Sequence, residues 1–553
     1  MYSSEPLHHF VDDYLQYLQE VHPTVAALDG VHAHDDLLED LSRPAIEADT
    51  RALAGFARRL SEIKQEGLTP VERIEHPIVA AHIRGRMFEA EEVRTWERNP
   101  QVYADVLAAS LAAQALFGYA PPTERARRVL SKLRQVARLI QAARDNVKDP
   151  PGIYVKVAIE TFRGTLTFIE RDLPRAFSGV DDLHLLGDLA DASTEAAVAI
   201  QGYLEFLERE QAPRARASFR LGRQKFEQKL KLEEGISLGT DRLLSIALRE
   251  LGETQEEFRR IASRLNGSDP TDAWRRAKAN HPAAGEIAKA AQQQITELAQ
   301  FVERHKLVTI PEGEPVVVAA TPDFYRWSSA SMWTPGPFET KPARAYYYVT
   351  DVDRSWPPDR QEEHLRDFNY PTLWAISMHE VCPGHFLQYQ HLRQVDSKVR
   401  KSLFFAPASF MEGWAHYCEQ MMMEAGFARE DQTVKLGQLQ EALIRLVRLI
   451  VGIRLHAEDL SVEQGVRMFK EDAFLEEAAA RREAERGTFD PRYVVYSAGK
   501  LMLLKLRKDV KAQQGAKFTL KAFHDALLAQ GAAPFGAHRQ MMLEGDGGGD
   551  LLE

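Results

Sequence analysis

The chain has 553 residues, of which 44% are hydrophobic and 27% charged, with a formal net charge of −11. This composition is typical of a soluble globular protein larger than one hydrophobic core, and the acidic balance argues against a nucleic-acid-binding protein. Only two cysteines occur, Cys382 and Cys418, which excludes a disulfide framework and favours a reducing compartment. Because neither a leader segment nor an apolar run of about 18 residues is present, we expect a cytoplasmic protein that does not bind membranes.

The first 300 residues are predicted to be helical. Apolar residues recur at helical spacing from about residue 7 to residue 210, for example Val129, Leu133 and Val136 after a Pro-Pro-Thr start signal. A further helix is predicted after Thr240, and the basic cluster from 214 to 231 reads as the solvated face of an amphipathic segment. We therefore predict an N-terminal helical lobe over residues 1–300.

A change of pattern follows, with three short β-rich runs at 307–310, 316–320 and 346–350. They predict a small sheet that either binds an extended substrate along its edge or covers the core as a structural hairpin. After residue 371 helical spacing returns. We predict a C-terminal lobe over residues 301–545 and, because of its glycines, a flexible tail over 546–553.

The motif of greatest chemical interest is His379-Glu380-Val381-Cys382-Pro383-Gly384-His385. In the common H-E-x-x-H signature, two histidines one helical turn apart bind zinc and the glutamate acts as general base. Here the second histidine is two residues late, which on a straight helix would place it roughly 120° away around the axis. Pro383 and Gly384 should break the helix and absorb the extra residues. The alternative is that Pro-Gly ends a buried helix and that both histidines are ordinary residues.

Glu412 favours the metal interpretation, because it supplies the third protein ligand that a catalytic zinc site needs. Glu412, His416 and Glu419 have i, i+4, i+7 spacing and share one helix face. Glu419 is therefore a candidate for orienting a ligand histidine, although a solvated polar stripe would give the same spacing. The same alternative applies to His416, which we do not assign as a ligand.

These motifs together resemble the bacterial domain-of-unknown-function family 885, which is grouped with gluzincin-like (peptidase MA-like) zinc metallopeptidases. The similar segments are His379-Glu380-x-x-Pro383-Gly384-His385-x-x-Gln388, Glu412-Gly413-Trp414-Ala415-x-Tyr417-x-Glu419, Arg448-Leu449-Ile450-Val451, His456 and Tyr496-Ser497-Ala498-Gly499-Lys500-Leu501 with Leu506-Arg507. The resemblance implies a mainly α, large two-lobed zinc-peptidase-like fold with a small β-sheet next to the active-site cleft. It also implies one zinc ion per chain, bound by His379, His385 and Glu412, with Glu380 as general base.

Four more residues of the C-terminal half are candidates for roles at this site. Tyr496 is the candidate hydrogen-bond donor to the oxyanion that forms when water attacks a carbonyl, and Tyr493 is the alternative. Lys500 and Arg507 are candidates for binding a substrate carboxylate, with internal salt bridges as the alternative for each. Arg448 and His456 lie in an apolar setting that favours structural roles.

We expect a zinc-dependent hydrolase that cleaves amide bonds of short peptides by metal-activated water. Two alternatives stay open. One keeps the metal and changes the substrate to a non-peptide amide such as an N-acyl amino acid. The other is a non-catalytic helical scaffold with a vestigial metal site. The expected partner is a small peptide, and the sequence sets neither the oligomeric state nor the end from which a peptide would be cleaved.

Overall fold

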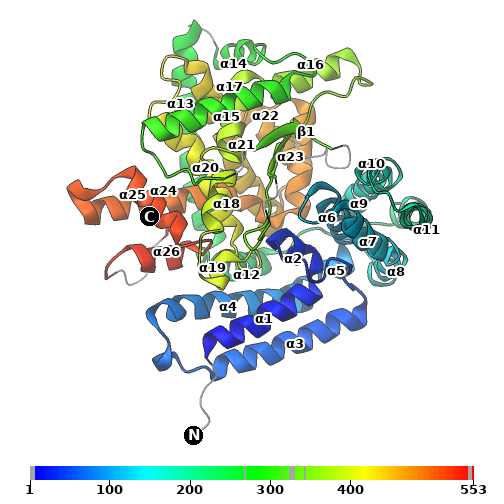
Figure 1. Cartoon of the computed structure of the whole chain (residues 1–553). Helices are drawn as coiled ribbons and strands as arrows, with labels where there is room; N and C mark the ends of the chain where they lie inside the picture. Colours follow the sequence, from blue (N-terminus) through cyan, green and yellow to red (C-terminus); the bar gives the residue numbers. More distant parts are fainter. Residues whose placement is uncertain are drawn as a thin grey trace.

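The computed structural model describes residues 6–266, 269–313, 316–322, 330–341, 344–545 and 551–552. It is mainly helical with one small three-stranded sheet, as expected (Figure 1). Within the described residues, none of the helices is both long enough and apolar enough to cross a membrane. The predicted flexible tail falls mostly on residues 546–550 and 553, which lie outside the described residues.

The N-terminal helices form two hydrophobic cores. One gathers around Phe10 and Tyr14 and includes Phe405 from the C-terminal half, and the other gathers around Phe162 and Tyr203. In Figure 1 they are the blue and the cyan groups of helices. The bounds are α1 (Leu7–Val21), α2 (Pro23–Asp29), α3 (Arg43–Glu62), α4 (Pro70–Phe88), α5 (Thr95–Arg98), α6 (Gln101–Leu116), α7 (Pro122–Leu133), α8 (Val136–Asn146), α9 (Gly152–Thr167), α10 (Leu173–Ala176) and α11 (Leu183–Phe206).

The largest core crosses the predicted lobe boundary at residue 300. Phe226 and Trp274 pack in the same cluster as Trp414, so the segment from α12 to α15 belongs with the helices that follow it. The bounds are α12 (Arg223–Glu234), α13 (Thr240–Asn266), α14 (Pro270–Lys278), α15 (Ile287–Arg304), α16 (Pro358–Asp367), α17 (Tyr370–Glu380), α18 (His385–Leu392), α19 (Lys398–Lys401), α20 (Ala408–Glu424), α21 (Gln432–Ala457), α22 (Val462–Asp472), α23 (Glu477–Phe489), the short helix η6 (Pro491–Val494), α24 (Val495–Gln514), α25 (Leu520–Ala529) and α26 (Phe535–Met542).

The sheet consists of β1 (Val317–Ala320), β2 (Ala330–Trp333) and β3 (Tyr346–Val349), with β3 in the centre. β3 pairs in parallel with β1 and antiparallel with β2. Two of the three predicted strands are confirmed. The prediction of a strand at 307–310 is wrong, because the main chain of Thr309 bonds to side chains: its N–H donates to Asp525 and its carbonyl contacts the ring of His391. β2 was not predicted, since its Ala-Ser-Met-Trp sequence lacks a β-branched run.

Helices α20 and α24 cross with their backbones in contact at two glycines. A Cβ atom on Gly413 would lie 2.6 Å from the carbonyl carbon of Gly499, and one on Gly499 would lie 1.9 Å from the carbonyl oxygen of Ser409. The distance between packed helices depends on the side chains at the crossing, so only glycines allow this approach. Glu412 and the start of α24 are thereby held close together.

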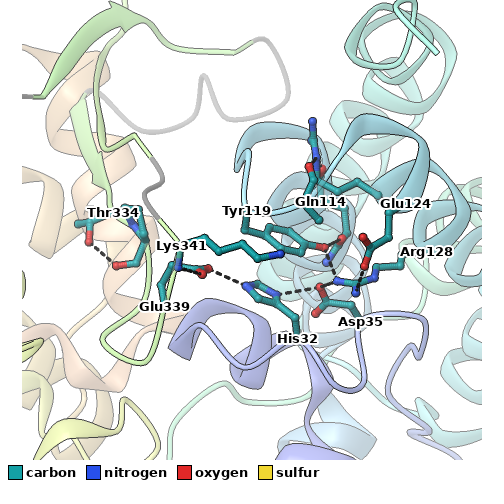
Figure 2. Close-up of polar contacts among 12 residues, drawn as sticks. His32, Asp35, Gln114, Tyr119, Glu124, Arg128, Thr334, Glu339 and Lys341 are labelled. Carbon is teal, nitrogen blue, oxygen red and sulfur yellow. Dashed lines mark hydrogen bonds and ion pairs between the residues drawn. The ribbon is translucent and has the colours of Figure 1, made fainter. Parts of the chain in front are cut away.

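A polar cluster around His32 joins the N-terminal helices to the loop after β2 (Figure 2). The two ring nitrogens of His32 lie 2.9 Å from Asp35 and 2.8 Å from Glu339, and the ring stacks on Tyr119 at 3.6 Å between centroids. Burial disfavours the charged imidazole, but the two carboxylates outweigh it and raise the pKa of His32. Arg128 completes the cluster by pairing with Asp35 at 2.8 Å.

Candidate metal centre

The helix break predicted at Pro383-Gly384 is confirmed, because α17 ends at Glu380 and α18 begins at His385. The turn is tight: a Cβ atom on Gly384 would lie 1.7 Å from the carbonyl oxygen of His379. Trp414 fixes the turn by donating its indole N–H to the Pro383 carbonyl at 2.9 Å. The break places the rings of His379 and His385 4.9 Å apart and almost perpendicular.

Three side chains converge on one point. Oε2 of Glu412 lies 3.3 Å from Nε2 of His379 and 3.5 Å from Nε2 of His385, and the three atoms lie within 4.8 Å of one another. Atoms that share a tetrahedral zinc ion at about 2.0–2.2 Å lie about 3.3–3.6 Å apart. Oε2 of Glu412 is buried yet makes no hydrogen bond within the described structure, an unsatisfied state that a cation between the three atoms would relieve. The residues therefore fit a zinc ion.

Glu419 lies behind the candidate ligand His379. Its carboxylate is fully buried, which rules out a solvated stripe, and lies 2.8 Å from Nδ1 of His379 and 3.3 Å from Arg445. Burial opposes its negative charge, but Arg445 and two histidines hold the pKa of Glu419 well below its usual range. A carboxylate that accepts the Nδ1 proton leaves Nε2 free to face a metal.

The protonation of His379 follows from its two carboxylate neighbours. Burial disfavours the imidazolium, but contacts with Glu412 and Glu419 raise the pKa of His379 to about 9. A divalent cation would take the place of that proton, so metal binding would release it. His416, in contrast, is buried, and burial and the charge of Lys500 lower its pKa to about 3, so its ring is neutral. It is not one of the three residues that converge.

The triad opens into a cavity of about 2170 Å³. Glu380 and Tyr496 line it beside the triad, and strand β2 and N-terminal helices such as α3 and α6 form other parts of its wall. The sheet is thus next to the cavity, as expected. The triad is therefore part of the cavity wall.

The two candidate tyrosines differ in their surroundings. Tyr496 lines the cavity, and its hydroxyl accepts a hydrogen bond from Arg486 at 3.1 Å. Burial and the charge of Glu412 raise the pKa of Tyr496, so its hydroxyl stays protonated at neutral pH. Tyr493 is fully buried, and its hydroxyl donates to the carbonyl of Glu483 at 2.8 Å. Of the two tyrosines, Tyr496 is therefore the one that lines the cavity.

The structure does not bring Lys500 or Arg507 to the cavity wall. Arg507 pairs with Glu424 at 2.8 Å and donates to the hydroxyl of Tyr417 at 3.0 Å, which is the internal pairing left open as its alternative. Lys500 is buried near Glu419, and burial lowers its pKa to about 8. These placements give neither residue a contact with a substrate in the cavity.

Arg448 and His456 line the cavity, and each is engaged in a contact with another part of the protein. Arg448 forms a bidentate pair with Glu483 at 2.6 and 2.8 Å, and the His456 ring bonds the Gly487 carbonyl at 2.9 Å. Sequence reasoning missed Arg486 and Arg492, which also line the cavity. The available signal was the spacing of Arg492, four residues before Tyr496 and so on the same helical face.

Comparisons with known proteins give a family and a fold. The family model described as "Bacterial protein of unknown function (DUF885)" matches residues 23–542. A solved structure from Shewanella oneidensis, described as a "putative lipoprotein of unknown function", is 25% identical with a TM-score of 0.80, covering 98% of this chain and 100% of that chain. A "putative lipoprotein" from Colwellia psychrerythraea is 20% identical with a TM-score of 0.80, covering 96% and 98%. Among curated proteins the search found no match.

Proposed function

The chain belongs to the bacterial family of unknown function DUF885, and we propose that it is a zinc-dependent hydrolase that cleaves amide bonds in short peptides. The observation that supports this proposal is the convergence of His379, His385 and Glu412 on the wall of a large cavity. A structural zinc site is normally closed by four protein ligands, whereas three ligands facing a cavity leave a position for water or substrate.

The residues around the triad suit this chemistry. A bound zinc ion would supply a Lewis acid that lowers the pKa of water and polarises a carbonyl. Glu380, which lines the same cavity, would accept a proton from the attacking water and deliver it to the departing amine as the C–N bond breaks. The Tyr496 hydroxyl would donate a hydrogen bond to the carbonyl oxygen as negative charge develops there.

The cavity favours short substrates over folded proteins. Elements from both halves of the chain surround it, and its wall includes strand β2. A volume of about 2170 Å³ exceeds the roughly 300–1,000 Å³ of pockets for drug-sized ligands and leaves room for a peptide of several residues. A small peptide is therefore the proposed partner.

The test compares the wild type with Glu380→Gln and His385→Ala. We expect about one zinc per wild-type chain by elemental mass spectrometry, kept in Glu380→Gln and lost in His385→Ala. Hydrolysis of a short-peptide library should fall at least about 100-fold in Glu380→Gln. Wild-type turnover of N-acyl amino acids without turnover of peptides would move the proposal to the amidase alternative. A zinc-loaded wild type that hydrolyses neither would reject hydrolysis.

The cytoplasmic location is retained as a proposal. The two solved relatives are described as putative lipoproteins. Fractionation of cells that express the chain from its native gene, followed by detection with an antibody, decides between a soluble and a membrane-associated pool.

A further inference from the structure

Among the described residues, two arginines of the cavity wall form no ion pair or hydrogen bond. Of the lysine and arginine side chains that line the cavity in the described part of the chain, the others each form an ion pair or hydrogen bond, as Arg448 does with Glu483. The exceptions are Arg482 and Arg492, and both are exposed. Because they line the cavity, that exposed surface faces the space where a substrate would bind.

Arg492 lies on the metal side of the cavity. It belongs to η6, directly before α24, and Tyr496 follows it by about one helical turn. Arg492 is close enough to Tyr496 to interact with it electrostatically, as Tyr496 is to Glu412. Tyr496, the candidate oxyanion donor, therefore lies near both the unpaired guanidinium of Arg492 and Glu412 of the triad.

Arg482 lies elsewhere along the cavity. Its charge acts on Asp367, which stands before the start of α17, whereas His379 stands at the end of that helix. The 11 residues of α17 span about 16 Å, so the carboxylate with which Arg482 interacts lies at the opposite end of α17 from the triad. The two unpaired arginines are therefore chemically alike but differently placed.

The carboxylates that surround Arg492 already have partners. Asp490 pairs with Arg486 at 3.1 Å, Glu233 pairs with Lys229 at 2.5 Å, and Glu234 accepts the backbone N–H of Ser409 at 2.7 Å. The donors of the Arg492 guanidinium are left for a ligand. Its planar fork matches a carboxylate in a bidentate pair, which a lysine ammonium cannot reproduce.

We infer that Arg492 binds a carboxylate of the substrate, which makes it a specificity-determining residue for peptides with an anionic group on one side of the scissile amide. This inference rests on the proposed function and names its substrate class. The carboxylate can come from the C-terminus of the peptide or from an aspartate or glutamate side chain. In the first case the protein removes residues from the C-terminal end, and in the second it selects an acidic position.

The experiment measures binding to the zinc-loaded Glu380→Gln protein. Three pools of N-acetyl tetrapeptides are supplied: C-terminal free acids with uncharged side chains, C-terminal amides with uncharged side chains, and C-terminal amides with one aspartate. The peptides retained on ultrafiltration are quantified by mass spectrometry. We expect one carboxylate-bearing pool to be retained at least about tenfold over the neutral amides. The preferred pool identifies the source of the carboxylate.

Matched substitutions are made in the same background. Arg492→Gln should reduce the preference below about twofold, and Arg482→Gln should leave it unchanged. Zinc content is measured for every variant, so a damaged site is recognised. If Arg492→Gln loses zinc, Arg492→Lys takes its place and should lose most of the preference, because a single ammonium cannot form the bidentate pair.

Equal retention of the three pools, or a preference that survives the substitution of Arg492, would overturn the inference. The outcome is independent of turnover. If the wild type hydrolyses none of these peptides, the hydrolase proposal fails, while the retention ratios still decide whether Arg492 recognises a carboxylate.

Discussion

Replacing Glu419 by glutamine tests whether this buried carboxylate sets the affinity of the triad for zinc. Glu419 is fully buried, and one of its oxygens lies 2.8 Å from Nδ1 of His379 and 3.3 Å from Arg445. Loss of a group that orients a ligand histidine typically weakens metal binding by about 10- to 100-fold, or roughly 1.4–2.7 kcal/mol. Glutamine keeps an oxygen that can accept the Nδ1 proton, so we expect the lower part of that range.

The dissociation constant for zinc is measured by competition with a chromophoric chelator at fixed pH. Glu424→Gln is the matched control, because Glu424 lies on the same helix but pairs with Arg507 at the surface, with 40% of its side chain exposed. The control should change the dissociation constant less than about twofold, as is usual for an exposed pair. An unchanged constant in Glu419→Gln, or an equal change in both variants, would refute the reasoning.

Three other substitutions test the site and its support. Tyr496→Phe should lower kcat by about 100-fold or more with zinc content unchanged, as for other oxyanion donors, and a wild-type rate would remove Tyr496 from the mechanism. Tyr493→Phe should instead lower Tm, since it removes the hydrogen bonds that the buried Tyr493 hydroxyl donates to the carbonyl and the carboxylate of Glu483, a loss of about 1–3 kcal/mol, while kcat is retained. His32→Gln should lower Tm most below about pH 6.5, because the raised pKa of folded His32 stabilises the fold when the ring is charged and that contribution disappears as pH rises through this pKa. Equal losses of Tm at pH 6 and pH 9 would contradict the last expectation.

The local geometry of the triad was predictable because it depends on short stretches of chain. Pro383 and Gly384 predict a break, and the break alone brings His385 toward His379. The i+7 spacing of Glu412 and Glu419 likewise fixes which side of α20 they occupy. Sequence spacing is a strong guide when one or two turns of helix separate the residues concerned.

Pairing between distant elements was not predictable in this way. Arg492 precedes Tyr496 and Arg507 follows it on a nearly continuous helix. Arg507 nevertheless pairs with Glu424 on α20, whereas Arg492 lines the cavity. Which arginine is left free depends on the carboxylates that other elements bring near it. The strand expected at 307–310 failed for a similar reason, because Asp525 and His391 engage its main chain.

The crossing of α20 and α24 bears on how the cavity would open and close. Gly413 and Gly499 place two backbones in contact, and sliding one helix past the other would bring residues with side chains to a crossing that has no room even for a Cβ atom. Packed interfaces of this kind shift between discrete arrangements and do not deform smoothly. Glu412 and Tyr496 should therefore move as one rigid body. A motion that admits a peptide is then expected between this body and the N-terminal helices that form other parts of the cavity wall, and the polar cluster around His32 is one of the contacts that this motion would have to change.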